Sequence, residues 1–196
     1  MKINIVRPIL PRLNDIKKKF DTCLETGLVT NNGINVRNFE KNLKKYLKSK
    51  NDPILFCNGQ MAFYSLIQAW KFKLKIKNNE KLYAIVPSFT WSGTVNSLFL
   101  NNITPIFCDI DDKFLLDIKK VENLLHKFKK IKNKIKFIIP VSNYGNIINL
   151  NYLKKFCKKN KIIALMDSAP AFGSKYKKKY PNNFGFDEMY SFHATK

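Results

Sequence analysis

Apolar positions in the first quarter of the chain recur at helical spacing. This spacing predicts one helix over Asp15 to Thr26, which ends at Gly27, and a turn follows at residues 30–33. The apolar face of a second helix then carries Val36, Phe39, Leu43, Tyr46 and Leu47. This part of the chain is therefore expected to be helical, behind an extended N-terminal arm.

From residue 54 onward, short apolar runs alternate with longer segments of helical periodicity. The short runs predict strands at residues 54–57, 82–86, 104–110, 136–141, 162–167, 172–176 and 188–192. The longer segments predict helices through Trp70, at 92–100, at 149–160 and after Asp117, which is expected to cap its helix. Strands separated by helices indicate an α/β fold, with a mostly parallel sheet and helices on both faces.

Polar residues follow several of these strands directly. In parallel sheets, ligands bind at the carboxyl ends of the strands. The segments at those ends are Asn58-Gly59, "PSFTW", "SNYG", Asp167, and the terminal "SFHATK" with Ser191 and Lys196. We expect them to converge on one crevice.

The charge of the chain is strongly positive, at +22, and comes almost entirely from lysine. Arg7, Arg12 and Arg37 are the arginines. Because nucleic-acid binders favour arginine at base and phosphate sites, the lysine runs are expected to be solvated surface. Nucleic acid is therefore not an expected partner, although a non-catalytic basic binding module stays open as an alternative.

The cysteines and the lengths of the apolar runs indicate the expected cellular location. Cys23, Cys57, Cys108 and Cys157 form no CxxC pair, the two histidines do not complete a metal set, and no metal site is expected. The cysteines are interpreted as buried, reduced thiols. With no apolar run near the ~18 residues of a membrane span and no signal peptide, the cytoplasm is the expected location and no membrane partner is expected.

Four residues at the expected crevice could bind a ligand or take part in catalysis. Gly59 opens a helix, where backbone amides favour an anion such as phosphate. Asp167 ends an apolar strand and needs a partner, which could be a cationic cofactor nitrogen, a lysine or a helix terminus. Trp91 could stack on an aromatic ring or pack in the core. Lys196 could form a Schiff base or could be exposed surface.

In combination, these motifs resemble the DegT/DnrJ/StrS family of sugar aminotransferases, which are pyridoxal-phosphate enzymes of fold type I. The resemblance runs over essentially the whole chain, through "RPILP", "CNGQMAFYSLIQAW", "IVPSFTWSGTVNSLFLNNITPIFCDID", "IIPVSNYGNIINL" and "LMDSAPAFGSKYKKKYPNNFGFDEMYSFHATK". It implies an N-terminal arm and helix over residues 1–34. It also implies a cofactor-binding large domain over residues 35–196, incomplete at its C-terminus and without the small C-terminal domain.

The resemblance also implies a role for each residue. Lys196 would form the Schiff base with pyridoxal 5'-phosphate, and Asp167 would pair with the ring nitrogen. Trp91 would stack on the ring, while Gly59, Gln60 and Ser191 would bind the phosphate. Two positions depart from the usual pattern: Gln60 replaces a hydroxyl residue, and Pro170 stands where a Gln or Glu is common.

The activity that the resemblance implies is transfer of an amino group from glutamate to a keto-sugar nucleotide, by a homodimer. Members of the family continue well beyond the lysine, so the resemblance implies that this chain is the N-terminal portion of such an enzyme and inactive alone. The alternative is an inactive fragment, or the basic binding module, that retains the sheet.

Overall fold

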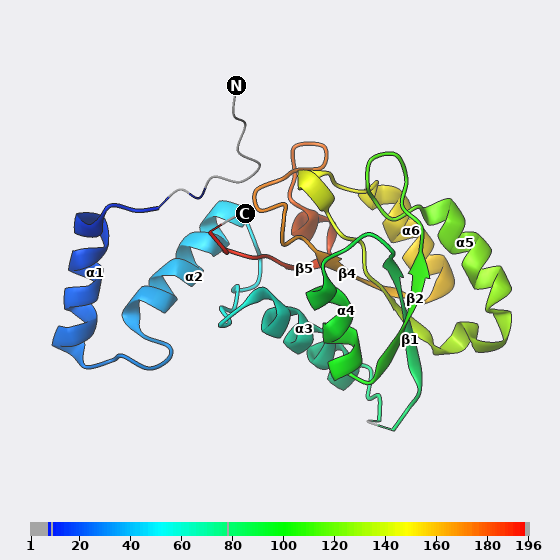
Figure 1. Cartoon of the computed structure of the whole chain (residues 1–196), viewed down its shortest axis with the longest axis horizontal. Helices are drawn as coiled ribbons and strands as arrows, with labels where there is room; N and C mark the ends of the chain where they lie inside the picture. Colours follow the sequence, from blue (N-terminus) through cyan, green and yellow to red (C-terminus); the bar gives the residue numbers. More distant parts are fainter. Residues whose placement is uncertain (1–7, 9, 78, 195–196) are drawn as a thin grey trace. The chain divides into compact units, whose positions relative to one another are not determined.

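The computed structural model describes residues 8, 10–77 and 79–194 (Figure 1). They form two compact units. The first holds the described residues up to Leu55 together with His193 and Ala194, and the second is residues 56–192. The expected division into residues 1–34 and 35–196 stays a prediction.

The first unit consists of two helices, α1 (Leu13–Thr26) and α2 (Ile34–Leu47). Gly27 ends α1 in the left-handed conformation, with φ 65°, which glycine adopts without a Cβ penalty. The side-chain amide of Asn35 donates a hydrogen bond to the Lys19 carbonyl at 2.9 Å and joins the two helices. Both helices confirm the expectation from the apolar spacing.

The second unit is built on a five-stranded parallel sheet. Its strands are β1 (Leu82–Pro87), β2 (Ile103–Cys108), β3 (Ile135–Ile138), β4 (Ile163–Asp167) and β5 (Asp187–Met189), in the order β2-β1-β3-β4-β5. Every neighbouring pair runs parallel, so all carboxyl ends lie along one edge. The predicted α/β class is confirmed.

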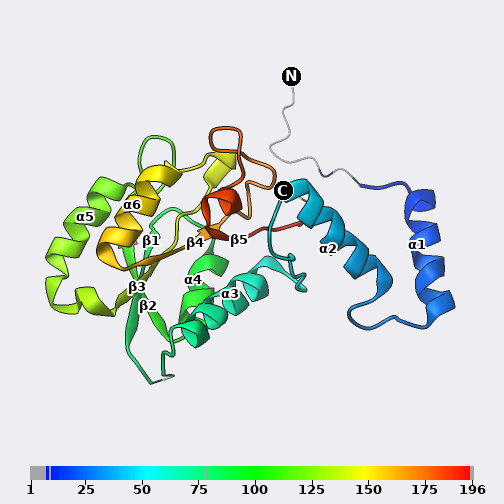
Figure 2. The same cartoon turned by 180° about the vertical axis from the view of Figure 1, so that it is seen from behind.

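Helices cover both faces of this sheet (Figure 2). α3 (Gly59–Lys73) and α4 (Ser92–Leu100) pack on the face that presents Ala84 and Val86 of β1. α5 (Ile118–Lys127) and α6 (Leu150–Asn160) pack on the face that presents Ile85. Because side chains alternate along a strand, one apolar strand supplies both cores. Three short 3-10 helices complete the unit: η1 (Lys129–Lys134), η2 (Asn143–Gly145) and η3 (Pro181–Phe184).

Two predicted strands are wrong. Residues 54–57 pair with no strand among the described residues, and Ile54 and Phe56 are 73% and 43% exposed. An apolar run becomes a strand only where a neighbouring strand pairs with its backbone, whereas here the Leu55 amide donates to the Glu40 carboxylate at 2.9 Å. Residues 172–173 form a turn and 174–175 have no regular structure, while Tyr176 pairs only with Lys179, in an isolated antiparallel bridge with backbone hydrogen bonds of 2.9 and 3.0 Å.

The cysteines are less uniform than expected. Cys108 and Cys157 are buried, Cys23 is half-buried and Cys57 is exposed, and none of them forms a disulfide. Cys57 is exposed because the strand predicted at residues 54–57, which would have buried it, does not form. Across the described residues, no helix is both long and apolar enough to cross a membrane, and no cluster of His, Cys, Asp or Glu is suited to a metal ion.

Candidate active site

The carboxyl edge of the sheet brings together the starts of α3 and α4 and the ends of β4 and β5. A Cβ placed on Gly59 would lie 3.2 Å from Met189 Sδ and 3.6 Å from Ser191 Cβ. The start of α3 is therefore tucked against the end of β5. A side chain at residue 59 would crowd this contact, so glycine lets the helix terminus approach closely.

The first turn of α3 presents backbone N–H groups at this edge. Asn58 caps the helix, and its side-chain oxygen accepts a hydrogen bond from the Met61 amide at 2.9 Å. Among the hydrogen bonds of the described residues, none uses the amides of Gly59 or Gln60. Two free amides at the positive end of a helix can bind a phosphate group, and the backbone of Gln60 can do so without a side-chain hydroxyl.

α4 begins beside α3. Trp91 is its N-cap residue and is 78% exposed, which rules out the core-packing alternative for this side chain. A Cβ placed on Gly93 would lie 3.0 Å from Trp91 Cδ1 and 3.5 Å from Gln60 Oε1. Ser97 Oγ lies 2.8 Å from the Gly93 carbonyl and 3.2 Å from the Gln60 carbonyl, so its hydroxyl is shared between α4 and the first turn of α3. An indole held here has a face available for a flat ring.

Asp167 ends β4 and is 3% exposed. Its Oδ2 accepts a hydrogen bond from Thr94 Oγ1 at 2.5 Å, and its Oδ1 accepts one from the Ala169 amide at 3.1 Å. Both oxygens of the buried carboxylate therefore have a donor that holds them in place. A buried carboxylate of this kind is suited to a cationic ring nitrogen.

A second buried carboxylate ties the ends of β4 and β5 together. Glu188 accepts hydrogen bonds from Ser168 Oγ at 2.8 Å, from the Asn182 amide at 2.9 Å and from the Tyr190 hydroxyl. Burial raises the pKa of Glu188 despite these donors, and burial also raises the pKa of Tyr190. The Ser168–Glu188 bond joins the residue after Asp167 to β5, whose end leads to Ser191.

Five of the six residues expected at the site thus lie at one edge of the second unit: Gly59, Gln60, Trp91, Asp167 and Ser191. Lys196 lies outside the described residues. The sequence reasoning missed Thr94 and Glu188. Thr94 lies three residues after Trp91, one helical turn along, and this spacing was the available signal.

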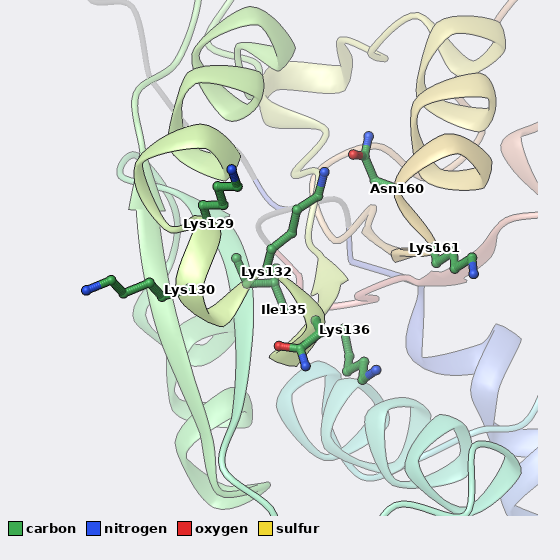
Figure 3. A pocket seen from close by; sticks show the side chains of 8 residues that line it. Lys129, Lys130, Lys132, Ile135, Lys136, Asn160 and Lys161 are labelled. Carbon is green, nitrogen blue, oxygen red and sulfur yellow. The ribbon is translucent and has the colours of Figure 1, made fainter.

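A hollow of about 530 Å³ lies away from this edge, at the opposite ends of β3 and β4. It is lined by Lys129, Lys130, Lys132, Asn133, Ile135, Lys136, Asn160 and Lys161. Figure 3 shows Lys132 extending toward Asn160, while Lys130 and Lys161 extend outward in opposite directions. Ammonium groups that spread apart in this way are solvated separately, which agrees with the interpretation of the lysine runs as surface.

Known proteins share both the sequence pattern and this fold. The profile of the DegT/DnrJ/EryC1/StrS aminotransferase family matches residues 12–196. The chain belongs to this family. The GDP-perosamine synthase of Escherichia coli O157:H7 is 28% identical over 188 residues, which cover 95% of this chain and 48% of that protein.

Two further relatives show the same coverage. The dTDP-4-amino-4,6-dideoxy-D-glucose transaminase of Shigella dysenteriae is 29% identical over 195 residues, or 99% of this chain and 49% of that protein. The PLP-form structure of Spr1654 from Streptococcus pneumoniae superposes with a TM-score of 0.76 at 22% identity, covering 100% of this chain and 50% of that one. The chain spans about half the length of these family members, and the fold expected from the resemblance is confirmed.

Proposed function

We propose that the protein acts as a pyridoxal-phosphate-dependent aminotransferase that passes an amino group from an amino-acid donor, glutamate, to a keto-sugar nucleotide. The observation that carries this proposal is the meeting of two free helix amides, an exposed indole and a buried carboxylate at one sheet edge. These groups fit the phosphate, the ring face and the ring nitrogen of one cofactor. Family membership and the names of the relatives support the substrate class.

Each residue then has a defined task. Gly59 and Gln60 bind the phosphate through their amides, with Ser191 beside them, and Trp91 holds the ring from one face. Asp167 keeps the ring nitrogen protonated. When bound, pyridoxal phosphate supplies the aldehyde that takes up an amino group and the ring that withdraws electrons from it. Lys196 is assigned the covalent link to the cofactor and, once released, the transfer of a proton at the substrate carbon.

The assembly and location follow from the same proposal. The protein works in the cytoplasm as a homodimer, in which a second copy completes the pocket for the sugar nucleotide.

The test is site-specific labelling. The purified protein is incubated with a low concentration of pyridoxal phosphate, reduced with borohydride and mapped by peptide mass spectrometry. We expect the pyridoxyl group on Lys196, and its loss in Lys196→Arg, which keeps the charge. Labelling spread evenly over the surface lysines would overturn the proposal and leave the non-catalytic alternative.

Substrate use is measured separately. Glutamate-dependent formation of 2-oxoglutarate is followed with GDP- and dTDP-linked 4-keto-6-deoxy sugars. Asp167→Asn is expected to lose far more turnover than cofactor affinity, because the amide cannot keep a ring nitrogen protonated. Equal losses of turnover and affinity would contradict the role assigned to Asp167.

A further inference from the structure

Two threonine hydroxyls form a hydrogen-bonded row that ends on Asp167. Thr90 Oγ1 donates to Thr94 Oγ1 at 3.0 Å, and Thr94 Oγ1 donates to Asp167 Oδ2 at 2.5 Å. Thr94 and Asp167 are each 3% exposed, so water does not compete for the last bond of the row. A bond from a hydroxyl to a buried carboxylate is charge-assisted and strong.

The chemistry of these groups fixes the direction of the row. An ionised carboxylate only accepts hydrogen bonds, and a threonine hydroxyl has a single proton to donate. Thr94 must therefore direct its proton to Asp167 and use its lone pairs for Thr90. Because the Ala169 amide donates to the other carboxylate oxygen at 3.1 Å, rotation of the carboxylate would break a bond at both oxygens.

The same helical turn also carries Trp91. The Thr94 amide donates to the Trp91 carbonyl at 3.1 Å, so the backbone of the first turn of α4 links the two residues. One helical turn thus carries the exposed indole of Trp91 and, three residues later, the buried Thr94 hydroxyl that bonds to the Asp167 carboxylate. A ring stacked on Trp91 and a nitrogen paired with Asp167 would take their relative geometry from this turn.

We propose that Thr94 is a positioning residue for the aminotransferase, which holds ionised Asp167 against the ring nitrogen of the cofactor, and that Thr90 orients the Thr94 hydroxyl. The inference rests on the proposed function. It assigns Thr94 no contact with the cofactor, because its single proton is already committed to Asp167.

The test compares two ligands in matched variants. Pyridoxal phosphate carries the ring nitrogen, and its 1-deaza analogue has a carbon there. Thr94→Val keeps the shape and removes the hydroxyl, Thr94→Ser keeps the hydroxyl, and Thr104→Val makes the same change at an exposed position of β2.

We expect the wild-type protein to prefer pyridoxal phosphate over the analogue. Thr94→Val should reduce this preference about tenfold, since it removes one hydrogen bond to a charged group. Thr90→Val should reduce it less, while Thr94→Ser and Thr104→Val should retain it. If Thr94→Val weakens both ligands equally, the residue is merely structural and the proposal is wrong.

A second measurement needs no cofactor. Hydrogen exchange at the Ala169 amide reports whether the carboxylate that it binds is held in place. Exchange should be faster in Thr94→Val and unchanged in Thr94→Ser; unchanged exchange in Thr94→Val would contradict the positioning role. If the wild-type protein is labelled at Lys196 and the Thr94→Val variant keeps the preference for pyridoxal phosphate, this inference alone is refuted. If the wild-type protein binds neither ligand and is not labelled at Lys196, the proposed function is refuted as well.

Discussion

Substitution of the residue that caps α3 tests the phosphate site directly. Asn58→Ala removes the 2.9 Å hydrogen bond to the Met61 amide, and such caps contribute about 1 kcal/mol to stability. The first turn of α3 then frays, and the Gly59 and Gln60 amides lose their common orientation. If the whole ~1 kcal/mol is felt at the phosphate, the Kd for pyridoxal phosphate rises about fivefold. Fluorescence titration of the cofactor and urea unfolding measure the two effects.

The matched control is the cap of a helix on the other face of the sheet from α3. Asn149 caps α6, where its side-chain oxygen accepts from the Tyr152 amide at 3.1 Å and from the Tyr176 hydroxyl at 2.8 Å. Asn149→Ala should therefore lower stability by at least as much as Asn58→Ala and leave the cofactor Kd unchanged. If Asn149→Ala weakens the cofactor equally, or if Asn58→Ala lowers stability alone, the phosphate does not bind at the α3 terminus.

Three further outcomes are expected. Trp91→Ala should weaken cofactor binding by a few-fold with little change in urea midpoint, because the exposed indole contributes only ~0.5–1.5 kcal/mol of stacking; a large loss of stability would contradict this. Burial raises the pKa of Cys157 to about 12, so at pH 8 iodoacetamide should modify exposed Cys57 and spare Cys157 until the protein unfolds, as mass spectrometry can show. Duplex DNA should bind weakly, without sequence preference and with a steep loss in salt. Lys132→Ala with Lys136→Ala should weaken this binding equally for all sequences and reduce its salt slope; tight binding at physiological salt would revive the basic binding module.

Local signals in the sequence were sufficient for most elements of the second unit. The helix predicted at 92–100 is α4, and the Asp117 cap accepts hydrogen bonds from the Lys119 and Lys120 amides at 2.9 and 3.3 Å. Helix periodicity and capping depend on residues within one or two turns, so a single sequence contains them. Strand 172–176 was mispredicted because nothing local reveals whether a partner strand will be present.

The residues of the candidate site could be predicted from the sequence, but their arrangement could not. Gly59, Trp91 and Asp167 could be proposed from their places at strand ends and helix starts, because parallel topology brings such ends to one edge. That edge and the order β2-β1-β3-β4-β5 exist only in the folded sheet.

The alternation of helices and strands, the α/β class and the chemistry available at the strand ends all follow from local patterns in the chain. Tertiary structure alone decided that Thr94 reaches Asp167, 73 residues away, and that Glu188 joins the ends of β4 and β5. Hydrogen bonds between distant residues depend on how helices dock on the sheet, to within fractions of an ångström. Local pattern carries no information at that precision, since docking is set by the packing of both apolar cores at once.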